Sequence, residues 1–369
     1  MKIGILTFHC AHNYGAMLQA FALQQYIKTL GHDVFLIDYR PIYITKQYRR
    51  FVLSRWFSYN ILRGIRKFSN ELMNFYSRCI RYSHFSKFIR EYLTLYPYHS
   101  SQDLLQFDLI LLGSDQIWSK GITGGKNDDL YWGKNIKVPV ASYAASARKF
   151  SILDESDRQY VIDALSHLVG ISVREKSLKE KLSVFTSRSI EQVLDPTLLV
   201  EKEVYAPLLQ NTFKESKPYV LIYQVVYDKN LGRIAHQIAD ELGVNVIEIC
   251  ANTESPQTPD CKRIVTASPV DFVQYIRNAR YVITSSFHGT ALSIVFERPF
   301  YTVKLGTDVD DRAISLLSSL NLENCSLDKT ADPITENFVN FSKAHELLDQ
   351  LRLQSRVYLN HVIEKVGNG

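Results

Sequence analysis

The sequence predicts an α/β protein made of two similar halves. Short apolar runs recur along the chain, and each is followed by a small polar loop and then by a helical pattern, which is the order strand, loop, helix. The pattern stops at Asp195-Pro196-Thr197 and starts again at Tyr219–Val225. A chain of 369 residues, 46% of them apolar, is also long enough for two cores. We expect a first domain over 1–200, a second over 216–335, and a helix over 336–366 that packs back on the first.

The first half opens as strand, helix and strand. An apolar run over 2–7 leads through a polar loop into a helix over 16–30, and a second apolar run covers 33–38. Loops of this kind lie at the carboxyl edge of a parallel sheet, where ligands bind. His9, His12 and Asn13 are therefore candidates for holding a sugar or an anion, although such side chains also close their own turns.

The same order returns later in the first half. Phe107–Leu112 is a continuous apolar strand, and the loop after it carries Asp115 and Gln116. Asp115 is a candidate carboxyl for chemistry, with the capping of its own turn as the alternative. Further strands are expected over 139–143 and 170–173, a helix over 154–168, and Arg174-Glu175 at the end of the last of these strands.

The most informative stretch lies in the second half, where an apolar strand over 281–284 meets a small polar loop over 285–289. A helix over 290–296 follows, ended by Pro299. A helix start offers unpaired N–H groups and a partial positive charge, and His288 beside it can exchange a proton near neutrality. We interpret this stretch as an anion site with an acid or base next to it, whereas a histidine that only caps the helix is the alternative.

The other elements of the second half complete a sheet with helices. Asp308-Val309-Asp310-Asp311 is an acidic turn, and Arg312 starts the helix after it. Helices are predicted over 230–242, 271–277, 312–320 and 340–365, and strands over 219–225, 244–249 and 300–304.

Positive charge is concentrated in one segment. Residues 46–90 contain eleven Lys or Arg and one acid, Glu71, whereas the net charge of the whole chain is only +5. Aromatic residues alternate with this charge, and the helical insertion they predict spans about 46–96. A surface of this kind suits docking on an anionic membrane, and a solvated helix with an aromatic inner face is the alternative.

Several classes of protein are not indicated. The five cysteines are scattered, no further ligands accompany the run His9-Cys10-Ala11-His12, and we expect neither disulfides nor a metal. No nicotinamide or flavin fingerprint and no nucleic-acid motif is present, so we expect no cofactor and no nucleic-acid partner. Without a leader or a spanning segment, we expect a cytoplasmic protein, with the inner face of the membrane as its docking surface.

Several motifs in order resemble the polysaccharide pyruvyl transferase family over nearly the whole chain. Taken singly these motifs are weak, but their shared order is specific. They are Asn13-Tyr14-Gly15-Ala16, Gly113-Ser114-Asp115-Gln116-Ile117-Trp118, Ser142-Tyr143-Ala144-Ala145-Ser146, Ser172-Val173-Arg174-Glu175, Val193-Leu194-Asp195-Pro196-Thr197 and Ser286-Phe287-His288-Gly289-Thr290.

The resemblance implies two Rossmann-like domains of the glycosyltransferase-B-like kind, with the site in the cleft between them. It also implies transfer of pyruvate from phosphoenolpyruvate to two hydroxyls of a sugar, as a cyclic ketal on a surface polysaccharide or its lipid-linked precursor. His288 matches the family's catalytic histidine and Arg174 an arginine that binds the donor. Some members carry an arginine where this chain has Ser286, and Arg312 is our substitute for it.

The chemistry of that reaction fits the residue types. A small dianion needs arginines and the N–H groups of a helix start, and the donor-binding set we predict is Arg174, Arg312, Ser285, Ser286, Phe287, Gly289 and Thr290. His288 and Asp115 are the predicted catalytic pair, and His9, His12, Asn13 and Gln116 are predicted to bind the acceptor. Two alternatives stay open: a nucleotide-sugar-dependent glycosyltransferase of the same fold, and a non-catalytic glycan-binding protein.

Overall fold

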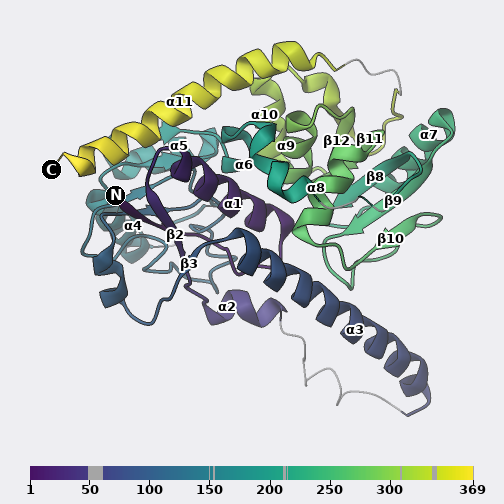
Figure 1. Ribbon diagram of the computed structural model, residues 1–369, viewed down its shortest axis with the longest axis horizontal. Helices are drawn as coiled ribbons and strands as arrows, with labels where there is room; N and C mark the ends of the chain where they lie inside the picture. The colour runs from purple at the N-terminus through teal and green to yellow at the C-terminus, as the bar shows by residue number, and fades with distance from the viewer. Residues whose placement is uncertain are drawn as a thin grey trace.

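In the computed structural model the chain forms two parallel β-sheets with helices packed around them (Figure 1). The structure describes residues 1–48, 61–148, 150–152, 154–210, 213, 215–307, 310–334 and 339–368, and of 47 and 61–73 only the backbone. The predicted α/β fold class is therefore confirmed.

The first sheet has the strand order β3-β2-β1-β4-β5, and all its pairs are parallel. Its strands are mainly apolar and mostly buried, as expected for a sheet covered on both faces. A two-stranded sheet, β6 with β7, continues from its edge through bridges at Ala141 and Ala145. The strands are β1 Lys2–Leu6, β2 Asp33–Ile37, β3 Leu95–Tyr96, β4 Leu109–Leu112, β5 Val140–Ser142, β6 Ser172–Val173 and β7 Glu191–Gln192.

The second sheet has the order β10-β9-β8-β11-β12-β13 and is also parallel throughout. Both sheets thus follow the Rossmann pattern, in which the first strand of the half lies between the second and the fourth. The strands are β8 Tyr219–Gln224, β9 Asn245–Cys250, β10 Lys262–Ile264, β11 Tyr281–Thr284, β12 Phe300–Lys304 and β13 Ser326–Asp328.

The helices begin at residues that satisfy their free N–H groups. Asn13, Asp154, Asp228 and Ser268 each accept a hydrogen bond from the first turn that they precede. The α-helices are α1 Tyr14–Thr29, α2 Ile42–Thr45, α3 Ile61–Tyr92, α4 Glu155–His167, α5 Lys176–Leu182, α6 Pro196–Leu199, α7 Lys229–Leu242, α8 Pro269–Asn278, α9 Phe287–Val295, α10 Asp311–Ser319 and α11 Phe341–Gly367. The 3₁₀ helices are η1 Lys46–Tyr48, η3 Ser101–Gln106, η4 Ser183–Phe185, η5 Lys202–Leu209 and η6 Glu323–Cys325.

One helix differs from its prediction in a way that matters for the site. The sequence predicts a loop over 285–289, but α9 already begins at Phe287, so His288 lies in its first turn. Gly289 makes this possible, because a Cβ there would lie 2.3 Å from Thr284 Oγ1. The missing side chain lets the helix start directly over the end of β11.

The strand order places four loops at one location. In a Rossmann sheet the crevice for ligands opens where the order reverses, beside the first and fourth strands. Those strands are β1 and β4 in the first half and β8 and β11 in the second. The loops after all four strands line one cavity, which is described below.

The last helix, α11, runs along both halves (Figure 1). His345 near its start donates from Nε2 to the carbonyl of Ile294 in α9, at 3.1 Å. Farther along, Arg352 donates to the carbonyl of Leu198 at 2.8 Å, and Tyr358 donates to that of Ser142 at 2.8 Å. The chain end therefore ties the second half to the first.

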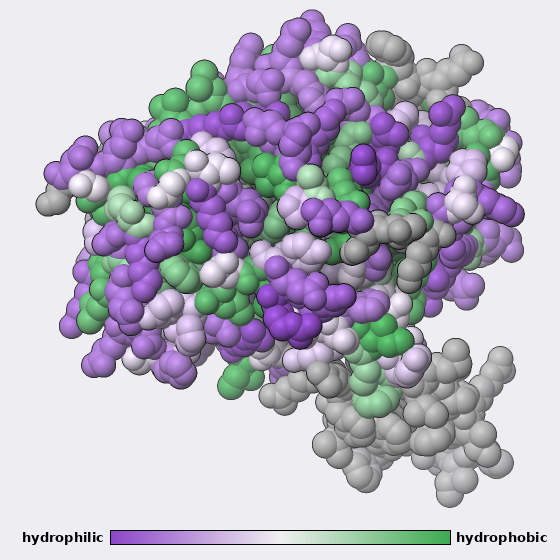
Figure 2. Space-filling view, in the orientation of Figure 1, coloured by the Kyte–Doolittle hydropathy of each residue, from purple (hydrophilic) through white to green (hydrophobic). Residues whose placement is uncertain are grey.

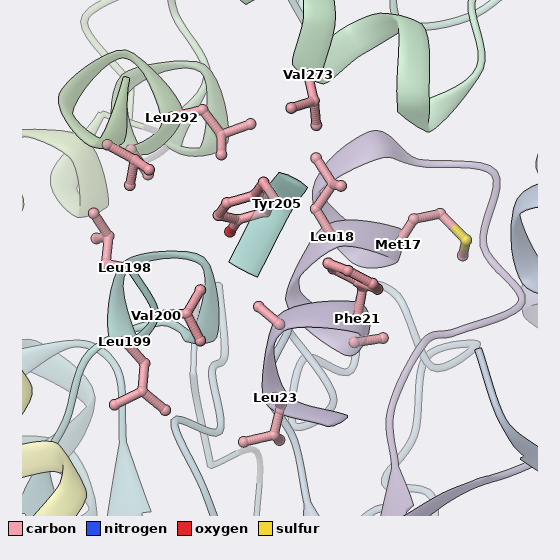
Figure 3. Close-up of a cluster of buried hydrophobic side chains, with 14 of the residues drawn as sticks. Met17, Leu18, Phe21, Leu23, Leu198, Leu199, Val200, Tyr205, Val273 and Leu292 are labelled. Atoms are coloured by element: carbon pink, nitrogen blue, oxygen red, sulfur yellow. The ribbon is translucent and has the colours of Figure 1, made fainter. Parts of the chain in front are cut away.

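A single apolar core continues from one half into the other. Figure 3 shows Leu18 and Phe21 of α1, Tyr205 of η5 and Leu292 of α9 meeting between the two sheets. The Tyr205 ring is 6.2 Å from that of Phe21 and 5.7 Å from that of Phe296, and its hydroxyl donates to the carbonyl of Thr197. Because these contacts are buried, the halves are held in one relative position.

The basic aromatic segment is partly described. Its helix, α3, projects from the body of the molecule (Figure 1), while residues 49–60 and the side chains of 61–73 lie outside the described part. None of the described helices is long and apolar enough to cross a membrane. The face in Figure 2 is mainly hydrophilic, with apolar residues scattered over it.

Candidate active site

The start of α9 forms one wall of the site. Ser286 donates its N–H to Thr284 Oγ1 at 3.0 Å, and Thr290 Oγ1 bonds Thr302 Oγ1 at 2.7 Å, which fixes the helix on its sheet. The side chain of Thr290 is thus directed into the core, and Gly289 faces Thr284. Both residues lie in the first turn of α9, whose N–H groups have no partner within the helix. They can therefore offer a ligand backbone N–H groups rather than side chains.

His288 lies at the contact between the two halves and is 9% exposed. Its Nε2 is 3.7 Å from Asp195 Oδ2 and makes no hydrogen bond in the described part of the chain. On the other side, the ring lies against Gly15 of α1, where a Cβ would be 2.0 Å from Nδ1. The imidazole is therefore held between a carboxylate and the backbone of the opposite half.

Asp195 is a candidate site residue that sequence reasoning missed, because we interpreted it as the end of the first domain. Its Oδ1 accepts from Thr197 N at 3.0 Å and Thr197 Oγ1 at 2.7 Å, so it caps α6. Its Oδ2 accepts from Arg174 at 2.6 Å and from Ser114 at 3.2 Å. Burial raises the pKa of this carboxyl, but the adjacent His288 and Arg174 outweigh burial and hold the pKa well below its usual range. Asp195 is therefore a buried carboxylate aimed at the histidine.

Arg174 has its guanidinium engaged within the protein. It donates to Asp195, to Glu175 Oε1 at 3.0 Å and to Ser146 Oγ at 3.0 Å, and its side chain is 4% exposed. Burial opposes its charge, but Glu175 and Asp195 raise the pKa above its ordinary value. Its Cζ lies 4.9 Å from the centre of the Phe287 ring. Direct binding of a donor by Arg174 stays a prediction; the observed contacts hold Asp195 in place.

Arg312, on α10, contrasts with Arg174. Its Cζ lies 6.0 Å from the Phe287 ring, and its guanidinium makes neither an ion pair nor a hydrogen bond with the described residues. Burial and the positive charge of Arg174 lower its pKa to about 10. Glu175, Asp115 and Asp195 oppose this shift from a distance, but none of them pairs directly with the guanidinium. A desolvated cation without a direct ion pair is a place for an anion. In the acidic turn before Arg312, residues 308 and 309 lie outside the described part of the chain. The Asp310 carboxylate accepts hydrogen bonds from the backbone N–H groups of Leu305, Gly306 and Thr307.

A cavity of about 300 Å³ is lined by the start of α9, His288 and Arg312, but not by Asp195 or Arg174. Buried polar atoms that lack a partner in the described part of the chain are found in its walls: Ser285 Oγ, Gln116 Oε1 and His288 Nε2. The second half lines it with Val225, Val226, Ser285, Ser286, Phe287, His288, Leu305 and Arg312, and the first half with Phe8, Ala11, Asn13, Ala16, Ile44, Tyr48, Asp115, Gln116, Gly121, Ile122 and Arg148.

The predicted residues of the first half divide into two groups. Asp115, Gln116 and Asn13 line the cavity, although Asp115 Oδ1 also accepts from Gln116 N at 2.7 Å and Asn13 Oδ1 from Ala16 N at 3.1 Å. Asp115 and Asn13 therefore close their own turns and also line the cavity.

His9 and His12 lie behind the wall of the cavity. His9 is fully buried, and its Nε2 is 2.8 Å from Asp38 Oδ1. The ring of His12 stacks on that of Phe85 at 5.1 Å. Their contact with an acceptor stays a prediction. No group of three or more His, Cys, Asp or Glu side chains in the described part of the chain is arranged to hold a metal.

Sequence reasoning also missed Tyr48 and Arg148, which line the cavity from segments that no motif marks. Tyr48 is half-buried, and burial raises the pKa of its phenol to about 12. Neither position follows from spacing along the chain.

Fold and cavity together define a class: a two-sheet α/β enzyme of the glycosyltransferase-B-like kind, with its polar site at the switch points of both sheets. A family model described as polysaccharide pyruvyl transferase matches residues 13–305. The chain belongs to this family and is a transferase. The predicted family is thereby confirmed.

Solved structures with a similar fold share little sequence with the chain. UDP-N-acetylglucosamine 2-epimerase from Rickettsia bellii is 11% identical, with coverage of 100% of this chain and 97% of that one and a TM-score of 0.48. UDP-GlcNAc 2-epimerase from Neisseria meningitidis bound to UDP-GlcNAc is 12% identical, with coverage of 96% and 94% and a TM-score of 0.45. UGT73P12 from Glycyrrhiza uralensis is 10% identical, with coverage of 100% and 96% and a TM-score of 0.47. The search among curated proteins gave no match.

Proposed function

We propose that this transferase moves pyruvate from phosphoenolpyruvate to two hydroxyls of a sugar, forming a cyclic ketal on a cell-surface polysaccharide or its lipid-linked precursor. The observation that carries the proposal is Arg312, a desolvated guanidinium without an acid partner in the described structure, in the same cavity as His288. A small dianion supplies the charge that this position lacks.

The donor lies between Arg312 and the first turn of α9 in this proposal. The N–H groups of that turn and the hydroxyls of Ser285 and Ser286 face the same cavity, so one anionic group can pair with Arg312 and another with the helix start. Ser285 Oγ, which has no partner in the described structure, gains one there. Arg174 acts behind this layer by holding Asp195 and the Phe287 ring.

The reaction moves protons at defined atoms. The methylene carbon of the donor takes up one proton and becomes the methyl group, while each of two sugar hydroxyls gives one up. Two C–O bonds form at the central carbon, and the C–O bond to phosphate breaks, so inorganic phosphate leaves as hydrogen phosphate with the second proton. In this proposal His288 accepts a hydroxyl proton, and the nearby Asp195 carboxylate stabilises the imidazolium that results. Asp115, on the facing wall, is the group for the other proton or for binding a hydroxyl.

The acceptor enters from the first half. Asn13, Asp115 and Gln116 present hydrogen-bonding groups to the cavity, and Tyr48 presents an apolar face of the kind that sugars stack on. His9 and His12 support this wall from behind through Asp38 and Phe85.

A thermal-shift comparison of donors tests the proposal. We expect phosphoenolpyruvate at about 100 times its Kd to stabilise the fold by roughly 2.7 kcal/mol, a rise of several degrees in Tm. Arg312→Gln should abolish this shift, and UDP-, GDP- and CMP-sugars, with or without magnesium, should not produce it. Stabilisation by a nucleotide sugar alone would favour a glycosyltransferase instead. An unchanged glycan affinity in His288→Asn, with no response to any donor, would favour a glycan-binding protein.

A further inference from the structure

A second cavity lies on the other side of Phe287 and Arg312. It has a volume of about 320 Å³, and among the described residues it shares only these two side chains with the first cavity. Within that part of the chain, Arg312 is therefore the one cation that lines both. The other charged groups that line the second cavity come from the first half: Arg174, Glu175, Lys179, Glu191 and Asp195.

Most of these charges are already paired. Arg174 uses its donors on Asp195, Glu175 Oε1 and Ser146. The Glu191 carboxylate accepts from Ser189 Oγ. Three groups lack such a partner within the described structure. The Lys179 ammonium and the Arg312 guanidinium make no ion pair there, and Glu175 Oε2 is a buried carboxylate oxygen with no hydrogen-bond partner.

Two cations beside one carboxylate acceptor define the ligand chemically. The cations require negative oxygens, and the carboxylate oxygen requires a donor, so the ligand carries both on one small group. Hydrogen phosphate does, because it keeps one proton at about pH 8, whereas sulfate and the phosphate ester of the donor carry none there.

We propose that the second cavity is a site for inorganic phosphate and gives this leaving group an exit separate from the acceptor's entrance. The proposal rests on the proposed function, in which the C–O bond to phosphate breaks beside Arg312. Since Arg312 lines both cavities, the phosphate moves from one to the other while it stays paired with a cation. Glu175 then distinguishes the product, which can donate a hydrogen bond, from the unreacted ester, which cannot.

Binding of inorganic phosphate and of sulfate to the full-length protein, measured by calorimetry at about pH 8 and matched ionic strength, tests this. We expect phosphate to bind at least about tenfold more tightly than sulfate. Lys179→Gln should weaken the binding of phosphate by about tenfold or more. It should leave the Kd of phosphoenolpyruvate within about twofold of the wild-type value, because Lys179 does not line the cavity of His288. Lys181→Gln, an exposed lysine of the same helix α5, is the matched control and should change neither.

Glu175→Gln gives an independent readout, since the amide keeps an oxygen for Arg174 and puts an N–H₂ where the acceptor was. We expect the ratio of phosphate to sulfate affinity to fall toward one, with the unfolding midpoint measured to confirm the fold. Equal binding of the two anions by the wild type, or phosphate binding that Lys179→Gln does not change, would overturn the proposal. Failure of the proposed function looks different, because phosphoenolpyruvate would then bind to none of the proteins.

Discussion

At the scale of single residues, the site depends on how the His288 ring is held. Gly15 leaves no room on one side of the ring, and the Asp195 carboxylate lies on the other. A general base loses effect when its nitrogen moves by a fraction of an ångström from the reacting proton. Gly15 therefore acts on the reaction through the histidine, although it presents no side chain.

Gly15→Ala should lower turnover strongly, because its Cβ would overlap the ring of His288. His288→Asn alone should cost about 10²–10⁴ in kcat, the usual scale for one acid or base. In the double variant we expect little loss beyond that of His288→Asn, since the residue through which Gly15 acts is already gone. His167→Asn, an exposed histidine of α4, is the control. Additive losses in the double variant would show that Gly15 acts elsewhere.

Asp195 links His288, the proposed catalytic residue, to the stability of the fold. A carboxyl whose folded pKa is depressed adds stability above its unfolded value of 3.8, and that stability is lost as the pH falls toward the folded pKa. Asp195→Asn should therefore destabilise the protein at neutral pH by about 3 kcal/mol, because the buried Arg174 loses one of its two carboxylate partners. Its free energy of unfolding should also fall less steeply between about pH 4 and about pH 3. Urea unfolding across this range checks both, and equal slopes for variant and wild type would contradict the pKa assignment.

At the scale of elements, α3 matters because it reaches across to the second half. Arg81, 6% exposed, donates to Tyr14 Oη at 2.5 Å and to the carbonyls of Ala251 and Cys250 at 2.7 and 3.3 Å. Tyr14 in turn stacks on Phe272 at 4.6 Å. Tyr14 precedes Gly15, so this helix anchors the part of α1 that touches His288.

Arg81→Met should destabilise the protein by about 3 kcal/mol, because several buried carbonyls lose their donor. We also expect kcat to fall while the Kd of the donor changes little, since Arg81 lines neither cavity. Lys87→Gln on the same helix, an exposed residue 3.9 Å from Glu91, should stay within about 0.5 kcal/mol of the wild type. If Arg81→Met matched that control in stability and kcat, α3 would have no part in positioning α1.

At the scale of the whole molecule, the sequence predicted what depends on local order and missed what depends on contact between distant segments. The strand, loop and helix order at 281–296 identified His288, because the carboxyl edge of a parallel strand is a general site. Gly15, Asp195 and Arg81 lie far along the chain from His288, and no spacing indicates that they meet. The predicted domain boundaries at 200, 216 and 335 stay predictions, and the core of Figure 3 continues across both halves.

The distribution of charge over the molecule leads to the last prediction, docking on an anionic membrane through the segment 46–90. Its eleven basic residues stand against one acid, and α3 projects away from the two sheets (Figure 1). Each Lys or Arg near an anionic surface contributes about 1 kcal/mol, and salt screens that attraction.

We expect cosedimentation with anionic vesicles at low salt that is lost at high salt and in a variant with Arg63, Arg66 and Lys67 changed to Gln. Changing the exposed Lys176, Lys181 and Lys202 instead is the matched control and should leave binding intact. Absence of binding at low salt, or equal loss in both variants, would leave the segment with a structural role only.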